Sequence, residues 1–306
     1  MVRHLLHLKD YTPAEIAKIV DKTIDVKKNP GKYAKALEGK SLIMLFQKTS
    51  TRTRLSFEIA MTQLGGHAVF VDWRTTQAGM ASLKDETKVF ARYADAIMAR
   101  MRLHKDVEEM ASASRVPFIN GLCEKYHPVQ ALCDLAIMKE KVGGLKGKKI
   151  VYTGMFNNVC NTLIDGCTKM GMQAVTFTPE FNEPSRDEEL MAAARATGLW
   201  RETKDLKKEV KDADFVYTDT WIDMEFFNDP AYAAEKERRM KAMMPSQVNA
   251  KLLEGSNAMV MHDMPIHEGY EMTRDAIEHP NSIIFDQAES RLHGEKAILL
   301  FLLGKM

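Results

Sequence analysis

Short apolar runs alternate with longer amphipathic stretches along this chain, and the alternation occurs in two series. The first series has apolar runs of strand length at residues 41–46, 68–71, 96–98 and 117–120. The second has similar runs at residues 150–152, 174–177, 215–217, 258–261 and 282–285. Between the runs, apolar residues recur at helical spacing. Strands that alternate with helices in this way predict parallel sheets covered by helices on both faces.

A glycine-rich break separates the two series. A long helical pattern opens at His127-Pro128 and runs to Lys141, and Gly143, Gly144 and Gly147 follow it. Such a break is typical of a domain boundary. Residues from about 287 to 306 form a last amphipathic helix.

Composition narrows the class of protein. The chain has 306 residues, 45% hydrophobic and 28% charged, which is typical of a globular protein with two domains. A net charge of +1 argues against general nucleic-acid binding, because there is no basic excess to release counterions. The N-terminal apolar stretch is too short for a signal peptide and the longest apolar run is far below a membrane span, so we expect a cytoplasmic protein. The four cysteines lack paired metal-ligand spacing and indicate reduced thiols, with no metal site.

Residues 46–54 carry the clearest chemical signal. The apolar run at 41–46 ends in a polar turn that contains Ser50, Thr51 and Thr53, and a helical pattern follows. The backbone N–H groups at such a helix start favour an anion, and Arg52 and Arg54 add guanidinium donors. The structural alternative is a capped helix with two solvated arginines, Arg54 pairing with a carboxylate along the helix. No Walker loop is present.

The stretch Ser50-Thr51-Arg52-Thr53-Arg54 resembles the carbamoyl-phosphate signature of the aspartate/ornithine carbamoyltransferase family. Four further matches follow in the family's order. They are Arg100 at the end of 95–100, His127-Pro128-Val129-Gln130, Asp219-Thr220-Trp221, and the segment 285–293 with Arg291. The resemblance covers nearly the whole chain and is closest to the ornithine branch.

The resemblance implies an α/β fold of two doubly wound parallel-sheet domains with the active site in the cleft between them. Residues 1–142 with 288–306 would form the carbamoyl-phosphate domain, and 143–287 the amino-acceptor domain. The resemblance implies no metal and no organic cofactor. The expected partners are carbamoyl phosphate, a small amine and further copies of the chain, with no nucleic acid or membrane.

The resemblance also assigns roles to individual residues. Carbamoyl phosphate would be bound by Ser50, Thr51, Arg52, Thr53, Gln77, Arg100, His127, Gln130, Met264 and Arg291. The phosphate would lie against residues 50–53, the carbonyl oxygen against Thr53, Arg100 and His127, and the carbamoyl NH2 against Gln130. Arg291 would close the site from the second domain. Gln77 matches a residue that serves a neighbouring subunit, which implies a trimer or a higher assembly of trimers. The catalytic set would be Arg52, Arg100, His127, Gln130, Asp263 and Arg291.

The chain departs from the ornithine branch where the acceptor is bound. The acceptor-binding set would be Asn158, Asp219, Asp223, Met224 and Asp263. The branch has His-Cys-Leu-Pro where this chain has His262-Asp263-Met264-Pro265, and Ser-Met-Gly where it has Asp223-Met224-Glu225. A thiol and a hydroxyl are thus replaced by carboxylates.

Two hypotheses about the acceptor follow from this exchange. In one, the added carboxylates favour a more cationic amine, such as the diamine putrescine. In the other, Asp223 and Glu225 face solvent, Asp263 accepts a hydrogen bond from the attacking amine, and ornithine is the acceptor.

Two other classes of function are alternatives to a carbamoyltransferase. A nicotinamide dehydrogenase is disfavoured, because Gly154-Met155-Phe156-Asn157-Asn158 lacks the glycines of a dinucleotide loop. A non-catalytic sensor of carbamoyl phosphate is the alternative of another class. His127 need not be a base, since the leaving phosphate can accept the amine proton, and the sequence does not fix its protonation.

Overall fold

The computed structural model describes residues 2–224 and 226–306 and divides into two compact units. Unit 1 comprises Met1–Gly143 and Glu289–Met306, and unit 2 comprises Gly144–Ala288. The domain bounds expected from the sequence differ from these by one residue at each junction.

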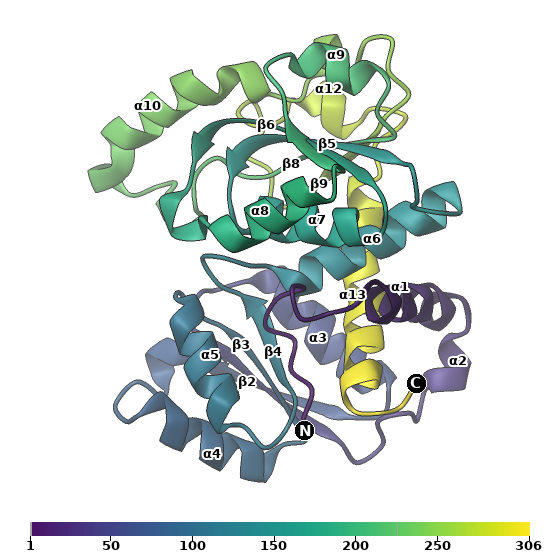
Figure 1. Ribbon diagram of the computed structural model, residues 1–306. Coiled ribbons are helices and arrows are strands. Elements are labelled where there is room, and N and C mark those ends of the chain that lie inside the picture. Colours follow the sequence, from purple (N-terminus) through teal and green to yellow (C-terminus); the bar gives the residue numbers. More distant parts are fainter. Residues whose placement is uncertain (1, 225) are drawn as a thin grey trace. The chain divides into compact units, whose positions relative to one another are not determined.

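Unit 1 is built on a four-stranded parallel sheet with the order β2-β1-β3-β4. Its strands are β1 (Ser41–Phe46), β2 (His67–Asp72), β3 (Ala96–Arg100) and β4 (Phe118–Leu122). Its helices are α1 (Pro13–Lys28), α2 (Pro30–Tyr33), α3 (Thr51–Gln63), α4 (Leu83–Tyr93), α5 (His104–Ala113), α6 (Pro128–Val142) and the part of α13 (Ile284–Leu302) that follows Ala288. Helices α4 and α5 cover one face of the sheet, and α3 and α13 the other (Figure 1).

Local sequence explains where the key helices of unit 1 begin and end. Thr12 and Glu15 form a capping box at the start of α1, with Pro13 at the first helical position. The Ser50 side chain caps α3 by accepting a hydrogen bond from the backbone N–H of Thr53. After α3, Gly65 adopts a φ of 83°, which ends the helix and returns the chain to β2.

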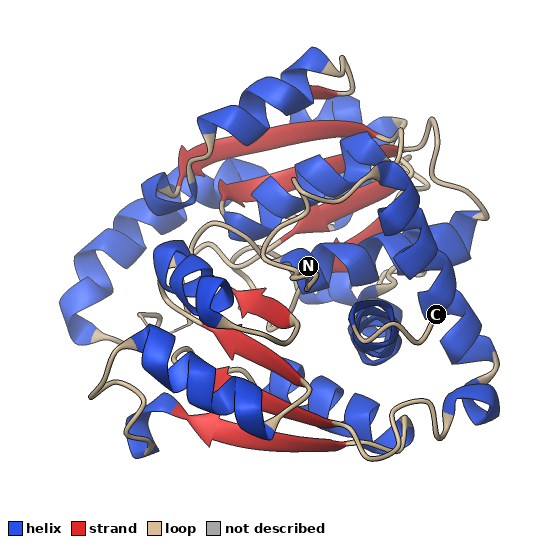
Figure 2. Cartoon of the chain, turned by 60° about the horizontal axis from the view of Figure 1, so that its bottom comes forward, coloured by secondary structure: helices blue, strands red, loops and turns tan. Residues whose placement is uncertain are grey.

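Unit 2 has a five-stranded parallel sheet with the order β7-β6-β5-β8-β9. Its strands are β5 (Lys149–Phe156), β6 (Gln173–Phe181), β7 (Trp200–Glu202), β8 (Phe215–Thr218) and β9 (Met259–His262). Its helices are α7 (Asn158–Lys169), α8 (Glu188–Ala196), α9 (Leu206–Lys211), α10 (Ala233–Met243), α11 (Ala250–Leu253) and α12 (Arg274–Ile277). Figure 2 shows the strands of each unit as a layer flanked by helices. The predicted fold class, two doubly wound parallel-sheet domains, is confirmed.

Short 3-10 helices lie in the connections. They are η1 (Trp73–Thr75), η2 (Glu183–Ser185), η3 (Pro230–Tyr232) and η4 (Met244–Ser246). No helix among the described residues is long and apolar enough to cross a membrane. All of the cysteines are buried free thiols.

Three local predictions were wrong or incomplete. Residues 282–285 do not form a strand: Ser282 makes one isolated bridge to Val260, and α13 already begins at Ile284. A short apolar run at the start of a buried helix has the same pattern as a strand, which explains the error. Strand β7 was missed because it is short and largely exposed. The turn expected at Gly154 lies inside β5, where Gly154 has a φ of 133° and leaves no room for a Cβ beside Thr218.

Candidate active site

The two sheets share one topological feature, a switch point between neighbouring central strands. In unit 1 the chain leaves β1 towards β2 and later continues from β3 to β4, so the switch lies between β1 and β3. In unit 2 it lies between β5 and β8. Open parallel sheets bind ligands outside the carboxyl ends of the strands at such points. The residues singled out in the sequence gather at both of them.

Thr53 is the centre of the cluster at the unit 1 switch point. Arg100, the last residue of β3, donates from Nη1 to Thr53 Oγ1 at 3.1 Å. Arg291 of α13 donates from Nη2 to the same oxygen at 2.6 Å, and the Ser50 hydroxyl lies 3.1 Å from it. Arg100 also donates to the carbonyl of Gly121 at 3.3 Å. Thr53, Arg100 and Arg291 are all at most 8% exposed, so two cations are held together in a buried place.

The expectation that Arg291 acts from the second domain was wrong. The residues of α13 from Glu289 onward belong to unit 1, and Arg291 lies beside Thr53 and Arg100 there. The carbonyl of Arg291 also accepts a weak hydrogen bond from Cys133 Sγ at 4.0 Å, and the neighbouring Ser290 hydroxyl donates to the Cys133 carbonyl at 2.9 Å. These contacts anchor α13 on α6.

A buried carboxyl group accompanies the two arginines. Glu295 is fully buried, and its Oε1 lies 3.7 Å from Arg291 Nη2. Burial raises the pKa of Glu295 to about 8, although Arg291, Ser56 and Arg100 oppose the shift. The carboxyl is therefore mostly protonated at neutral pH and does not neutralise the guanidinium pair. The cluster keeps a net positive charge that suits an anion.

His127 and Gln130 stand at the start of α6, beside the arginine cluster. Burial, together with the charges of Arg100 and Arg291, lowers the pKa of His127 well below its usual range. The imidazole is therefore neutral at pH 7. Gln130 Nε2 donates to Asp134 Oδ1 at 2.9 Å, which orients the amide. Gln130 Oε1 is buried and accepts no hydrogen bond from any described residue, so it can accept one from a ligand.

The remaining residues of the phosphate signature lie at the surface end of the cluster. Thr51 is exposed, and Ser50 and Arg52 are half-buried. Arg54 points along α3, where Nε donates to Glu58 at 3.0 Å and the guanidinium covers the Phe70 ring at 3.8 Å. Arg54 therefore pairs with a carboxylate along the helix, as in the structural alternative given for it in the sequence analysis.

Gln77 lies apart from this cluster in the connection between β2 and α4. It is exposed, and its carbonyl accepts a hydrogen bond from Met80 N at 2.9 Å. The adjacent turn is fixed by packing, because a Cβ on Gly79 would meet the Trp73 ring at 2.8 Å.

The unit 2 switch point brings an amide and a carboxylate together. Asn157 follows β5 and Asp219 follows β8, and Asn157 Nδ2 donates to Asp219 Oδ2 at 2.7 Å. Asp219 Oδ1 accepts the backbone N–H of Thr220 at 2.7 Å. Asn158, which the sequence favoured, is half-buried, and its Oδ1 accepts a hydrogen bond from the backbone N–H of Val159 at 3.0 Å.

A second carboxylate acts on Asp219. Burial and the charge of Asp263 raise the pKa of Asp219 to about 7, against the opposing effects of His262 and Asn157. Asp263 follows β9, the neighbour of β8, so the carboxyl ends of adjacent strands place the two side chains near each other. Met264 comes next, with a φ of 62°, a cis bond to Pro265 and a backbone N–H that donates to His262 Nδ1 at 2.7 Å.

Asp223 and Met224 are exposed residues of the loop after β8, with Met224 51% exposed. Asp223 lines a cavity of about 100 Å³ that belongs to unit 2. Asn157, Thr220, Tyr232 and Arg239 are among its other lining residues. Glu225, expected to face solvent, lies outside the described residues. Among the residues described, no group of three or more His, Cys, Asp or Glu side chains is placed to hold a metal ion.

Comparison with known proteins agrees with this arrangement. The carbamoyl-P binding domain of aspartate/ornithine carbamoyltransferase matches residues 3–140, and the Asp/Orn binding domain matches residues 146–302. This chain belongs to the aspartate/ornithine carbamoyltransferase family.

Relatives of this carbamoyltransferase resemble it over almost their whole length. It is 46% identical to an ornithine carbamoyltransferase of Pyrococcus horikoshii, over 99% of this chain and 96% of that protein. An anabolic ornithine carbamoyltransferase of Pyrococcus furiosus is 45% identical over the same shares. The structure of an ornithine carbamoyltransferase from P. furiosus superposes with a TM-score of 0.90 at 43% identity, covering 99% and 98% of the two chains. One from Thermus thermophilus gives 0.86 at 35% identity, covering 98% of each.

Three site residues of this carbamoyltransferase escaped the sequence reasoning. Asp134 and Glu295 each lie four residues after a predicted site residue on the same helix, and that spacing places them beside Gln130 and Arg291. This four-residue spacing was the available signal. The sequence predicted Asn158 as the acceptor-binding residue instead of Asn157. The two asparagines are adjacent, and the sequence does not show which of them is the N-cap of α7.

Replacing Glu295 with Gln tests the buried carboxyl. The native pKa is raised above the unfolded value, so the native state binds more protons between about pH 4.5 and 8 and loses stability as the pH rises through that window. Glu295→Gln cannot ionise, so we expect the variant and the parent to have similar stability near pH 5. At pH 8 the variant should be more stable by on the order of 1–3 kcal/mol.

Urea unfolding at several pH values measures this difference. A variant whose stability relative to the parent is the same at pH 5 and pH 8 would contradict the raised pKa.

Proposed function

We propose that this carbamoyltransferase transfers the carbamoyl group of carbamoyl phosphate to the side-chain amine of ornithine, giving citrulline and phosphate. The observation that carries the proposal is the convergence of Arg100, Arg291 and Ser50 on the Thr53 hydroxyl at the unit 1 switch point. This cluster has the charge of a phosphate site and matches the family's carbamoyl-P binding domain. The matched relatives are named ornithine carbamoyltransferases.

The phosphate end of the donor is assigned to the first turn of α3. The orphan backbone N–H groups there, with Ser50, Thr51 and the guanidinium of Arg52, favour a dianion. Arg100 and Arg291 add two buried cations, and the protonated Glu295 leaves their charge available. Fixed donors in a buried place need no reorganisation when charge develops, which is the usual source of rate enhancement in acyl transfer.

The carbamoyl end is assigned to Thr53, Arg100, His127 and Gln130. The amine lone pair attacks the carbonyl carbon, the oxygen becomes an oxyanion, and the C–O bond to phosphate then breaks. A neutral His127 donates a hydrogen bond to the oxyanion and does not act as an acid. Gln130 Oε1 accepts a hydrogen bond from the carbamoyl NH2, with its amide held by Asp134. The departing phosphate takes the amine proton.

The acceptor is assigned to residues of unit 2. Asp219, held by Asn157 and the Thr220 N–H, suits the α-ammonium of an amino acid. The matched relatives are named ornithine carbamoyltransferases, so ornithine is favoured over putrescine. Asp263, Asp223 and Met224 are proposed to tune the affinity for the cationic acceptor, and Asn158 to bind its carboxylate. Met264 is proposed to contact the donor. The cleft between the domains and the cytoplasmic location stay predictions.

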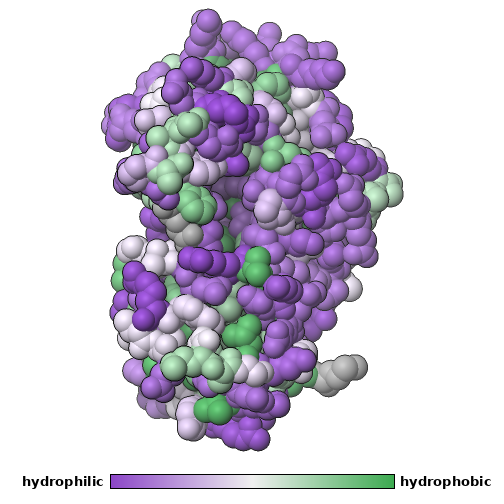
Figure 3. Space-filling model, turned by 90° about the vertical axis from the view of Figure 1, so that its left-hand side faces the viewer, coloured by the Kyte–Doolittle hydropathy of each residue, from purple (hydrophilic) through white to green (hydrophobic). Residues whose placement is uncertain are grey.

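We also propose a ring of at least three subunits, because Gln77 is exposed and matches a residue that serves a neighbouring subunit's site in the family. Edge strand β2 and helix α3 support a subunit contact nearby. Val69 is 42% exposed, Leu55 49% and Ile59 42%, so apolar side chains remain at the surface of unit 1. The face drawn in Figure 3 carries apolar patches among hydrophilic residues. Closed rings are the usual solution for heterologous contacts.

Replacing Arg52 with Ala tests the donor site. Loss of a charge-assisted contact to phosphate should cost on the order of 3 kcal/mol of transition-state stabilisation, roughly a hundredfold in kcat/KM for carbamoyl phosphate. Arg92→Ala, which removes an exposed arginine of α4, is the matched control and should retain parental rates. Initial-rate kinetics at saturating ornithine give the comparison. A loss below about threefold would refute the assignment of Arg52.

Asp263 is the test of the acceptor site. Asp263→Asn keeps the shape but removes a charge that attracts an ammonium, so the KM for ornithine should rise several-fold while the KM for carbamoyl phosphate stays nearly constant. Asp263→Cys, the residue of the ornithine branch, should improve ornithine use relative to putrescine. Competition assays with both amines measure the ranking. If neither variant changes it, Asp263 does not select the acceptor.

Subunit complementation tests the ring. An Arg100→Ala chain and a Gln77→Ala chain, each inactive alone, should form hybrid rings with partial activity, because an intact site needs both residues from different chains. A mixture of Arg100→Ala with His127→Ala is the control, since both residues lie in one chain's cluster, and should stay inactive. Subunit exchange is confirmed by mass spectrometry. If subunits exchange and the mixture of Arg100→Ala with Gln77→Ala is as inactive as the control mixture, the site is not shared between subunits.

A further inference from the structure

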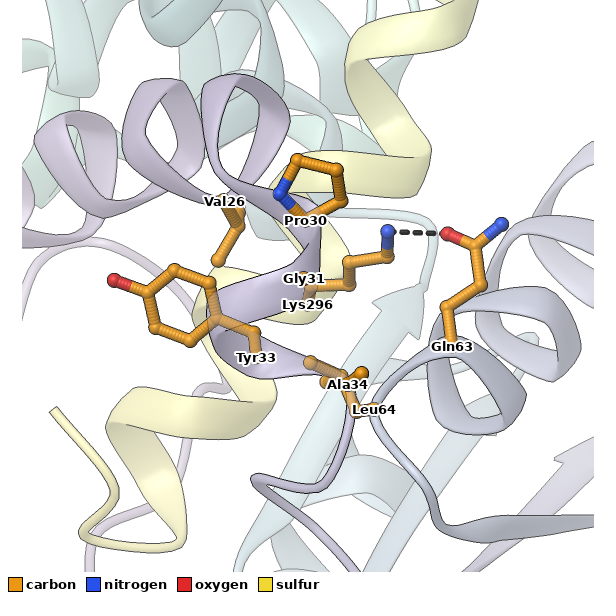
Figure 4. Close-up of a pocket in the computed structure, with 8 residues that line it drawn as sticks. All are labelled: Val26, Pro30, Gly31, Tyr33, Ala34, Gln63, Leu64 and Lys296. Carbon is orange, nitrogen blue, oxygen red and sulfur yellow. Dashed lines mark hydrogen bonds between the residues drawn. The ribbon is translucent and has the colours of Figure 1, made fainter.

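A cavity in unit 1 lies outside the arginine cluster. Its volume is about 310 Å³, within the range of small-molecule pockets. Its lining comes from α1, from α2 and its C-cap residue, from the end of α3, and from α13. The lining residues are Val26, Pro30, Gly31, Tyr33, Ala34, Gln63, Leu64 and Lys296 (Figure 4). Most of this lining is apolar.

Lys296 is the only charged residue of that lining, and it is 3% exposed. Its ammonium donates to the neutral amide oxygen of Gln63, the single hydrogen-bond partner that it has among the described residues. Burial lowers the pKa of Lys296, and no carboxylate is close enough to oppose the shift. Buried ammonium groups are normally paired with an acid, as Lys27 is with Glu140 at 2.9 Å.

The two acidic residues adjacent in sequence to the cavity lining, Asp25 and Glu295, have other partners, and Glu295 Oε1 lies 3.7 Å from Arg291 Nη2. Asp25 accepts hydrogen bonds from Tyr33, Asn29 and Lys32. Figure 4 shows the Tyr33 hydroxyl pointing away from Lys296, whose ammonium faces Gln63. An anion inside the cavity would therefore give Lys296 the partner that the chain does not provide, and the Gln63 NH2 group could donate to the same anion.

We propose that this cavity binds a small carboxylate with an apolar body. The carboxylate would accept hydrogen bonds from Lys296 Nζ and from the Gln63 NH2 group, and the apolar body would lie against Val26, Tyr33 and Leu64. A ligand in this position bridges the end of α3 to α13, so binding should also raise the thermal stability of the protein. The proposal does not depend on the identity of the amine acceptor.

Calorimetric titration of the intact protein with 3-phenylpropionate tests the site, with 3-phenylpropanamide and phenethylammonium as neutral and cationic analogues. We expect the acid to bind at least tenfold more tightly than either analogue. Lys296→Met should weaken acid binding at least tenfold, which corresponds to about 1.4 kcal/mol. Lys28→Met, which removes an exposed lysine of α1 outside the cavity, should change it less than twofold.

Ala34→Phe provides a second variant that keeps Lys296 and its hydrogen bond. Ala34 is exposed, has a helical φ of −56°, and lines the cavity, so a phenyl group can fill the space without burying a polar atom. This variant should lose acid binding while keeping its fold by circular dichroism. The proposal is overturned if the parent binds no acid at about 10 mM, if acid and amide bind equally, or if both cavity variants bind like the parent.

Discussion

The structure depends on the common direction of strands in its two parallel sheets. Because all strands of a sheet run the same way, the loops after neighbouring central strands emerge at one edge, and the switch point keeps helices from covering it. Register pairs Phe46 with Arg100 in unit 1. The turn after β1 and the end of β3 are therefore fixed together by backbone hydrogen bonds, as from Gln47 N to the Arg100 carbonyl at 2.9 Å. This register therefore determines how Arg100 is placed relative to Thr53.

Buried positive charge is the cost of that cluster. Placing Arg100 and Arg291 side by side in a water-poor place disfavours the empty state, since like charges repel and lose hydration. The lowered pKa of His127 keeps this residue from adding a third positive charge, whereas the raised pKa of Glu295, about 8, leaves the two guanidinium charges uncompensated. A bound dianion would neutralise what the chain leaves uncompensated. The same uncompensated charge that would favour a dianion therefore also disfavours folding of the cluster.

The sequence predicted the units, most strands and the helix start at Ser50 from local patterns, whereas the grouping of Thr53 with Arg100 was implied by the family resemblance. The Ser50 cap, for example, is encoded within four residues. What it missed depended on tertiary context. No local pattern shows that a helix begins at Ile284, and the role expected for Arg291 in the second domain conflicted with the domain bounds, which placed residues 288–306 in the first. The choice between Asn157 and Asn158 depends on where β5 ends. Gly154 suggested that the strand ends before it, whereas β5 continues to Phe156.

The carboxylate pair of unit 2 has a consequence for acceptor binding. Burial and the charge of Asp263 raise the pKa of Asp219 to about 7, so Asp219 is about half protonated at neutral pH. An ammonium that binds beside Asp219 favours the ionised form and must expel that proton. Linkage then makes acceptor binding tighter as the pH rises through 7, until the ammonium itself loses its charge. A thiol at position 263 would remain neutral and would not raise the pKa of Asp219 in this way. Burial of Asp219 and the carboxylate at position 263 together therefore couple acceptor affinity to pH near neutrality.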